Sequence, residues 1–228
     1  TLGSKFISQA GKPFAAVFFP LAAHYPYDCR ESVANRHSRA DYGKCVVESD
    51  TNLAKLLEEF NRLGLMQDTL FVVVGDHGES FGEHGLFVHN SSMHDEEVAV
   101  PLVFWSEDGR LGDRLIPYSR QIDIEPTIAD LMGAMRANIP VQGVSLLRQQ
   151  NPNPAAFMAT FFDGLGSALY EPPFKYILEP STNSLTMFDH TNDPFEKSPL
   201  KIDEEKTREV IDRIRAFYAY QESVFPNR

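Results

Sequence analysis

Long apolar runs, basic clusters and cysteines are all scarce in this chain of 228 residues. No stretch approaches the roughly 18 uncharged apolar residues of a membrane-spanning helix, and the first residues lack the charged start and apolar core of a signal peptide. The chain has 21 basic and 32 acidic side chains, a formal net charge of −11, and no run of Lys or Arg. We therefore expect no membrane span and no nucleic-acid partner, although a metal could attract an anionic ester locally.

The chain contains only two cysteines, Cys29 and Cys45. No second pair with ligand spacing lies near them, which argues against a zinc finger. Two interpretations stay open, namely a disulfide formed in an oxidising compartment and two unrelated thiols. A disulfide would be the main support for the location that we predict, which is periplasmic or otherwise extracytoplasmic.

Apolar patterning predicts an α/β fold for the first part of the chain. Residues 14–19, 69–74 and 98–105 are short, mainly apolar runs, which are typical of strands covered on both faces. Residues 48–63 carry apolar side chains at steps of three and four, which predicts an amphipathic helix ending at Gly64. Strand, helix and strand in this order indicate a parallel crossover, so we predict a mostly parallel sheet flanked by helices.

The pattern changes after the Pro- and Asn-rich residues 149–154. Before them a short helix is expected over residues 124–133. After them short apolar runs separated by Gly, Pro and Asn predict a small antiparallel sheet, and one apolar stripe predicts a terminal helix. The expected strands and helix cover residues 156–162, 174–178, 185–188 and 203–225. We therefore predict two domains, residues 1–150 and residues 151–228.

Four of the seven histidines fall within one polar loop, residues 75–97, which follows a predicted strand. Open α/β sheets assemble their sites in loops at the carboxyl ends of strands. Asp76 and His77 are the first side chains able to bind a metal after the strand, and an anionic oxygen beside an imidazole suits zinc, manganese or iron. Glycines in the loop let the backbone approach a ligand closely. This pattern favours a metal site over a merely solvated turn.

Two further histidines of this loop, His84 and His94, have simpler interpretations. His84 lies between Glu83 and Gly85 and is expected only to stabilise the loop. His94 is followed by three acidic residues and is expected to be a surface residue.

The loop and its flanks resemble the alkaline phosphatase/sulfatase superfamily. The resemblance rests on VGDHGESFGEHG at residues 74–85, on His89, and on EEVAVPLVF at residues 96–104. Further matching segments occur in the order of the family, and they are KPF at 12–14, HYP at 24–26, DIEPT at 123–127, GVSLL at 143–147, FKYI at 174–177, MFD at 187–189 and NDPFE at 192–196. The resemblance covers nearly the whole chain but only the latter half of such an enzyme.

The resemblance implies an alkaline phosphatase-like fold that ends in a small antiparallel sheet plus helix. It implies that Asp76 and His77 hold one divalent ion, with calcium, manganese and zinc as alternatives. His24 and His89 correspond to groups that bind the transferred oxyanion or protonate the leaving oxygen of an anionic sulfate or phosphate ester. No Cys-x-Pro-x-Arg motif is present, so the nucleophile and a further acidic ligand would come from a missing N-terminal half. We expect this chain alone to hydrolyse esters poorly.

Three functions remain open at this point. The Asn-Asp-Pro-x-Glu segment favours a hydrolase of the sulfatase type. His89, where many sulfatases carry Lys, and the cysteine-bearing insertion after His24 also resemble membrane-linked phosphoethanolamine or phosphoglycerol transferases. The third alternative is an inactive sulfatase-like binding domain.

Overall fold

The computed structural model describes residues 5, 7, 9–11, 13–29, 38–134, 142–148, 155–159, 166–179 and 181–224. The chain forms two compact units. The first consists of Thr1–Val73 and Val103–Asp113, and the second consists of Val74–Leu102 and Arg114–Arg228. The predicted domain boundary between residues 150 and 151 lies outside the described residues and stays a prediction.

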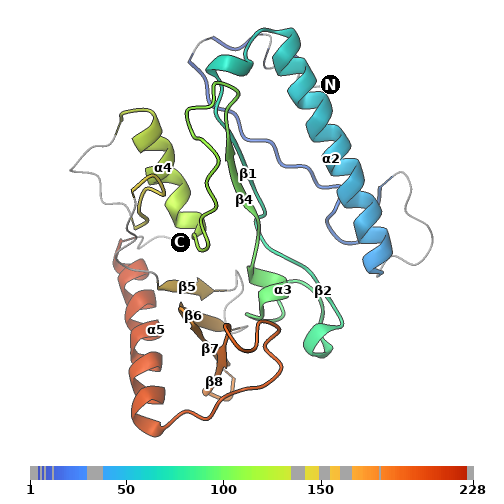
Figure 1. Ribbon diagram of the computed structural model, residues 1–228. Helices are drawn as coiled ribbons and strands as arrows, with labels where there is room; N and C mark the ends of the chain where they lie inside the picture. The colour runs from blue at the N-terminus through green and yellow to red at the C-terminus, as the bar shows by residue number, and fades with distance from the viewer. Residues whose placement is uncertain are drawn as a thin grey trace. The chain divides into compact units, whose positions relative to one another are not determined.

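A long helix dominates the first unit (Figure 1). The Ser38 hydroxyl caps its start by accepting a hydrogen bond from the Asp41 N–H at 3.1 Å. Gly64 follows its end with a φ of +66°, which glycine adopts without steric cost. The helix predicted over residues 48–63 is thus confirmed and begins earlier. The elements with residues in this unit are α2 (Arg39–Arg62), η1 (Met66–Asp68), and the paired strands β1 (Phe71–Val74) and β4 (Leu102–Trp105).

Aromatic packing joins α2 to the strands. Phe60 is buried, and its ring centroid lies 5.0 Å from that of Phe71, which in turn lies 5.4 Å from that of Trp105. Ile7 and Met66 complete this small core. The apolar stripe of α2 therefore packs against β1, as predicted for an amphipathic helix.

One strand prediction is wrong in this structure, and another is confirmed only in its C-terminal half. Residues 14–19 form no strand, and Val17 and Phe19 are 82% and 73% exposed. An apolar run becomes a buried strand only beside a hydrogen-bonded neighbour, and no described strand pairs with this one. The strand expected from residue 98 begins at Leu102, because three acidic residues favour a helical turn, α3 (Asp95–Val98). Of the predicted mostly parallel sheet, the described residues show only the β1–β4 pair.

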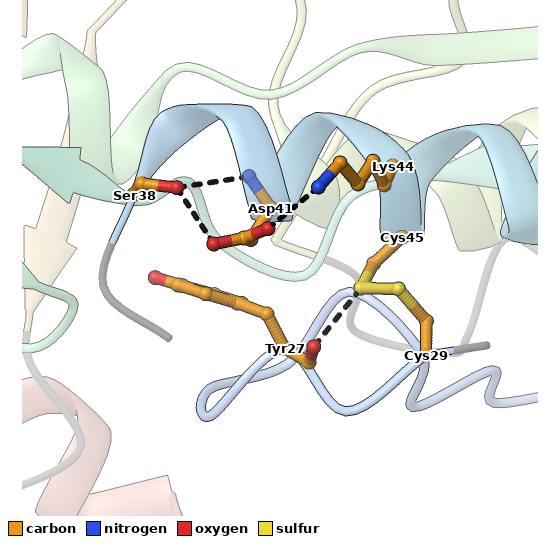
Figure 2. Close-up of a disulfide and its surroundings, with 6 residues drawn as sticks. All are labelled: Tyr27, Cys29, Ser38, Asp41, Lys44 and Cys45. Carbon is orange, nitrogen blue, oxygen red and sulfur yellow. Dashed lines mark hydrogen bonds and ion pairs between the residues drawn. A yellow bond between two sulfur atoms is a disulfide. The ribbon is translucent and has the colours of Figure 1, made fainter. Parts of the chain in front are cut away.

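A disulfide joins Cys29 to Cys45 of α2 (Figure 2). Their Cα atoms are 5.4 Å apart, and Cys45 is fully buried. The Cys45 sulfur also lies 3.3 Å from the carbonyl oxygen of the buried Tyr27. Of the two interpretations left open by the sequence, the structure has the disulfide, which ties residues 27–29 to the helix.

The second unit contains a four-stranded antiparallel sheet with a long helix beside it (Figure 1). The small antiparallel sheet and the terminal helix are therefore confirmed, as is the helix expected over residues 124–133. One strand, β6, was not expected from the sequence. The elements are β2 (Ser80–Phe81), η2 (Glu83–Gly85), β3 (Phe87–Val88), α3, η3 (Gln121–Asp123), α4 (Ile124–Leu131), β5 (Ala156–Ala159), β6 (Ser167–Glu171), β7 (Phe174–Glu179), β8 (Ser184–Asp189) and α5 (Glu204–Val224).

The sheet and α5 share one apolar core. Leu169 and Tyr176 of the sheet are buried with Val210 and Ile214 of α5. Glu196, in the turns that follow β8, contacts the loop of residues 75–97, called the histidine loop below. No helix in the described part of the chain is long and apolar enough to cross a membrane.

Candidate functional site

Asp76 and His77 lie directly after β1. The Gly75 N–H donates to the Pro101 carbonyl at 3.2 Å, and the Gln121 side-chain amide donates to the carbonyls of Gly75 and Asp76 at 2.8 and 2.9 Å. The Asp76 side chain is 69% exposed, and one of its oxygens accepts the His77 N–H at 3.1 Å. The backbone here is therefore held while the carboxylate faces solvent.

The hydrogen bonds of His77 determine which ring nitrogen can bind a metal. Its Nδ1 lies 2.8 Å from the Gly78 carbonyl, which only accepts, so Nδ1 carries the proton. Its Nε2 then carries the lone pair and lies 3.9 Å from Asp76 Oδ2. Two atoms can share one ion when their separation is below twice a metal–ligand distance, about 4.2 Å for zinc. This donor pair, with its backbone-anchored imidazole, fits a divalent ion.

His89 stacks on His77. The ring centroids are 4.1 Å apart and the planes make an angle of 27°. His89 Nδ1 lies 3.1 Å from the carboxylate of Glu79, whose side chain is buried. Val88 and Asn90 on either side have φ values of +65° and +62°, a costly conformation for a β-branched residue. The loop thus accepts backbone strain at the residues that present His89.

Glu97 holds the interior of the loop together. Its buried carboxylate accepts the Ser80 hydroxyl at 2.7 Å and the Ser91 N–H at 2.8 Å. Burial raises the pKa of Glu97, but the hydrogen bonds from Ser91, Ser80 and Ser92 outweigh burial and lower it. Gly78 packs so closely on this segment that a Cβ would lie 2.1 Å from the Glu96 carbonyl oxygen. The buried carboxylate therefore stays ionised and fixes β2 to α3.

His24, the remaining predicted site residue, lies in the first unit. Its side chain is exposed, and Nδ1 lies 2.6 Å from the Tyr25 carbonyl. The structure brings Asp76, His77 and His89 together in the second unit. That His24 acts on the same ester as His89, as the resemblance implies, stays a prediction.

A second cluster lies where the loop meets the C-terminal sheet. Ligand atoms of Asp95, His190 and Glu196 lie within 4.8 Å of one another, which is close enough for one metal ion. However, the Lys175 ammonium lies 2.6 Å from Asp95 and 2.8 Å from Glu196. A cation already contacts both carboxylates, so we interpret the cluster as an ion-pair network.

His84 and His94, for which we predicted no part in the metal site, belong to this network. His84 donates to Glu96 at 2.7 Å and to the Glu196 carbonyl at 2.9 Å, so it stabilises the loop as predicted. His94 was expected on the surface, but its side chain is only 16% exposed and bonds to Glu196 at 2.8 Å. The expectation for His94 is wrong because its partner is 102 residues away and invisible to local sequence patterns.

Sequence reasoning missed several residues that hold the site. Glu79 stands within the DHGE motif and Glu196 ends the NDPFE motif, so both had a signal in the quoted segments. Glu97 and Lys175 also lie within quoted segments, EEVAVPLVF and FKYI, whereas Gln121 lies outside them. Each acts through contacts that only the folded chain reveals.

A family model described as Sulfatase matches residues 2–134. A curated relative, the choline-sulfatase of Rhizobium meliloti (strain 1021), is 28% identical over 176 residues, which are 72% of this chain and 33% of that protein. The chain thus spans about a third of that relative's length.

Solved structures share the fold. One is BT4656, solved in complex with its substrate D-glucosamine-2-N,6-O-disulfate, with a TM-score of 0.65 and 22% identity over 78% of this chain and 39% of that one. Another is BT1596, a 2-O GAG sulfatase, with a TM-score of 0.61 and 20% identity over 81% of this chain and 42% of that one. The α/β fold of sulfatases with a C-terminal antiparallel sheet and helix is confirmed, and the family-model match shows that this chain belongs to the sulfatase family.

Proposed function

We propose that the chain is part of a metal-dependent hydrolase of sulfate esters, with phosphate esters as the nearest alternative substrates. The observation that carries the proposal is the placement of Asp76 Oδ2, His77 Nε2 and the His89 ring in one loop. A carboxylate and an imidazole lone pair form a donor set for a divalent ion, and an adjacent imidazole can serve the reacting ester. The similarity to a choline-sulfatase supports a sulfate ester.

Each site residue has a distinct task. Asp76 and His77 hold one ion, calcium, manganese or zinc, which when bound supplies positive charge for the ester oxygens in a chain of net charge −11. Glu79 orients the His89 ring through Nδ1, and His89 then binds the oxyanion or donates a proton to the leaving oxygen. Of these two roles, binding the oxyanion and donating the proton, His24 performs the one that His89 does not.

We further propose that residues outside this chain complete the site. A nucleophile and further ligands are needed, and the match covers only 33% of the choline-sulfatase. Val73, Val103 and Trp105 of the β1–β4 pair are exposed apolar residues, as expected for strands of a larger, mostly parallel sheet flanked by helices. In that domain residues 1–150 form the latter half of the α/β part and residues 151–228 the C-terminal subdomain.

The Cys29–Cys45 disulfide supports a periplasmic or otherwise extracytoplasmic location for this proposed enzyme. Disulfides persist in oxidising compartments and are rare in reducing ones.

An ester panel tests the function. Aryl sulfate, aryl phosphate and phosphodiester substrates are offered, with zinc, manganese and calcium each supplied, to this chain and to a longer protein that contains it. We expect turnover of the aryl sulfate by the longer protein, its loss in His77→Ala, and little or none by the 228 residues alone. Turnover restricted to a lipid phosphoethanolamine or phosphoglycerol donor would instead indicate a transferase. If the longer protein neither hydrolysed nor transferred any of these esters, the result would indicate an inactive binding domain.

A further inference from the structure

Glu196 is the centre of the ion-pair network between the C-terminal sheet and the histidine loop. Its side chain is 1% exposed. One carboxylate oxygen lies 2.8 Å from both Lys175 Nζ and His190 Nε2. The other accepts His94 Nδ1 at 2.8 Å and the Asp95 N–H at 2.9 Å. A single carboxylate thus accepts from two groups of the sheet region and two groups at the start of α3.

The main chain of Glu196 adds a third connection. Its carbonyl accepts His84 Nε2 at 2.9 Å, while His84 Nδ1 donates to Glu96. The His84 and His94 rings stack with centroids 3.6 Å apart and planes within 4°. Glu196 itself has a φ of +52°, a conformation that few residues other than glycine adopt. The backbone is therefore held in an uncommon geometry where it meets the loop.

Two carboxylates of this network, those of Asp95 and Glu196, share the Lys175 ammonium. Lys175 is fully buried and also bonds to Asp95 at 2.6 Å. Burial raises the pKa of Glu196, but bonds from His94 and Lys175 lower it well below its usual range, so the carboxylate is ionised. A buried pair that loses one partner leaves an uncompensated charge, which is strongly destabilising. The loop conformation that satisfies all these groups is hence strongly favoured over alternatives.

A continuous chain of contacts leads from Glu196 to the site loop. Its first step is the hydrogen bond to Asp95 at the start of α3, which also contains Glu97. Glu97 accepts the Ser80 hydroxyl at 2.7 Å. Ser80 is adjacent in sequence to Glu79, whose carboxylate contacts His89.

We propose that Glu196 is a positioning residue, through which the C-terminal sheet sets the conformation of residues 76–97. This inference rests on the proposed function, because that function is what makes residues 76–97 the site. The group of Asp95, His190 and Glu196 is on this view no metal site, because Lys175 supplies its cation. Removing the charge of Glu196 loosens the loop first and leaves the sheet and α5 in place.

Hydrogen–deuterium exchange of the 228-residue chain tests this. We compare wild type, Glu196→Gln, and Glu205→Gln, which makes the same substitution at an exposed position of α5. Glu196→Gln is expected to speed exchange in residues 79–98 roughly tenfold or more, with much smaller changes in α5 and in the Glu205→Gln chain. Should Glu196→Gln fail to fold, His94→Leu removes one hydrogen bond to the Glu196 carboxylate and the stacking on His84, leaves the Asp95 N–H bond in place, and is expected to act on the same peptides.

Two results would overturn the proposal. One is unchanged exchange in residues 79–98, and the other is an equal increase over β5–β8 and α5, which would make Glu196 a general stabilising residue. Manganese titration of a longer protein that contains this chain keeps the two proposals separate. Absence of manganese binding by a longer wild-type protein that contains this chain would contradict the metal site while the exchange result still decides the role of Glu196.

Discussion

The imidazoles of His77 and His89 stack face to face, with centroids 4.1 Å apart. Each has its Nδ1 tied to the loop itself, His77 to the Gly78 carbonyl and His89 to Glu79. Rings held in this way cannot turn independently, so the lone pair of His77 Nε2 has one direction.

Asp76→Asn is expected to weaken manganese binding roughly tenfold or more, because the substitution replaces an anionic ligand by a neutral one. Asp50→Asn, at an exposed position of α2, is the matched control and should leave the affinity unchanged. Calorimetric titration of a longer protein that contains this chain measures both. Equal affinities in the two variants would contradict the assignment of Asp76.

Gly78→Ala is expected to destabilise the protein by about 1–3 kcal/mol, because the new Cβ would lie 2.1 Å from a backbone oxygen, that of Glu96, which no side-chain rotation can move. Gly43→Ala is the control. Apart from its chain neighbours and the backbone of its own helix, no heavy atom lies within 4 Å of its added Cβ, so the substitution should stabilise α2 by about 1 kcal/mol. Urea unfolding gives both free energies. A Gly78→Ala chain as stable as wild type would show that the loop can move away from residue 78.

Reduction of the Cys29–Cys45 disulfide is expected to lower the free energy of unfolding by about 3 kcal/mol, since it frees a loop with a sequence separation of 16. Unfolding of oxidised protein and of Cys29→Ser/Cys45→Ser measures the difference. Thiol titration in denaturant, without reductant, is the complementary measurement. Two free thiols in protein from its native compartment would contradict both the disulfide and the extracytoplasmic location.

Local patterns predicted those elements whose partners are close in sequence. The helix α4 (Ile124–Leu131) was predicted from Pro126 in its first turn and Gly133 after its end, and α5 was predicted from its own apolar stripe. Residues 14–19 are apolar enough for a strand, but a strand depends on a neighbour that its own sequence does not specify. His94 illustrates the same limit at the site, because the burial of its side chain depends on Glu196.

Glu97→Gln tests the pH dependence of stability. The folded pKa of Glu97 is below the ordinary value of 4.5, so its ionised form stabilises the folded state above that pH and the contribution is lost as pH falls through the folded pKa. The difference in unfolding free energy between wild type and Glu97→Gln should therefore be largest near neutral pH and shrink below about pH 4.5. A difference in unfolding free energy that is constant with pH would mean that Glu97 stabilises the fold through its shape and not through its charge.

His84 gives the opposite dependence. Burial lowers the pKa of His84, but the hydrogen bond to Glu96, the bond to the Glu196 carbonyl and the charges of both carboxylates outweigh burial and raise it above 6.5. Its contribution to stability is therefore fully present below pH 6.5 and is lost as pH rises through the folded pKa.

The test is a proton NMR titration of the His84 ring in wild type, Glu96→Gln and Glu205→Gln. Glu96→Gln removes the largest of the effects that raise the pKa, so the His84 midpoint should fall, whereas Glu205→Gln should leave it unchanged. The stability of Glu96→Gln should consequently change less between pH 6 and 8 than that of wild type. An unmoved midpoint would show that the Glu196 carbonyl alone holds the second proton on His84, since that acceptor is intact in both variants.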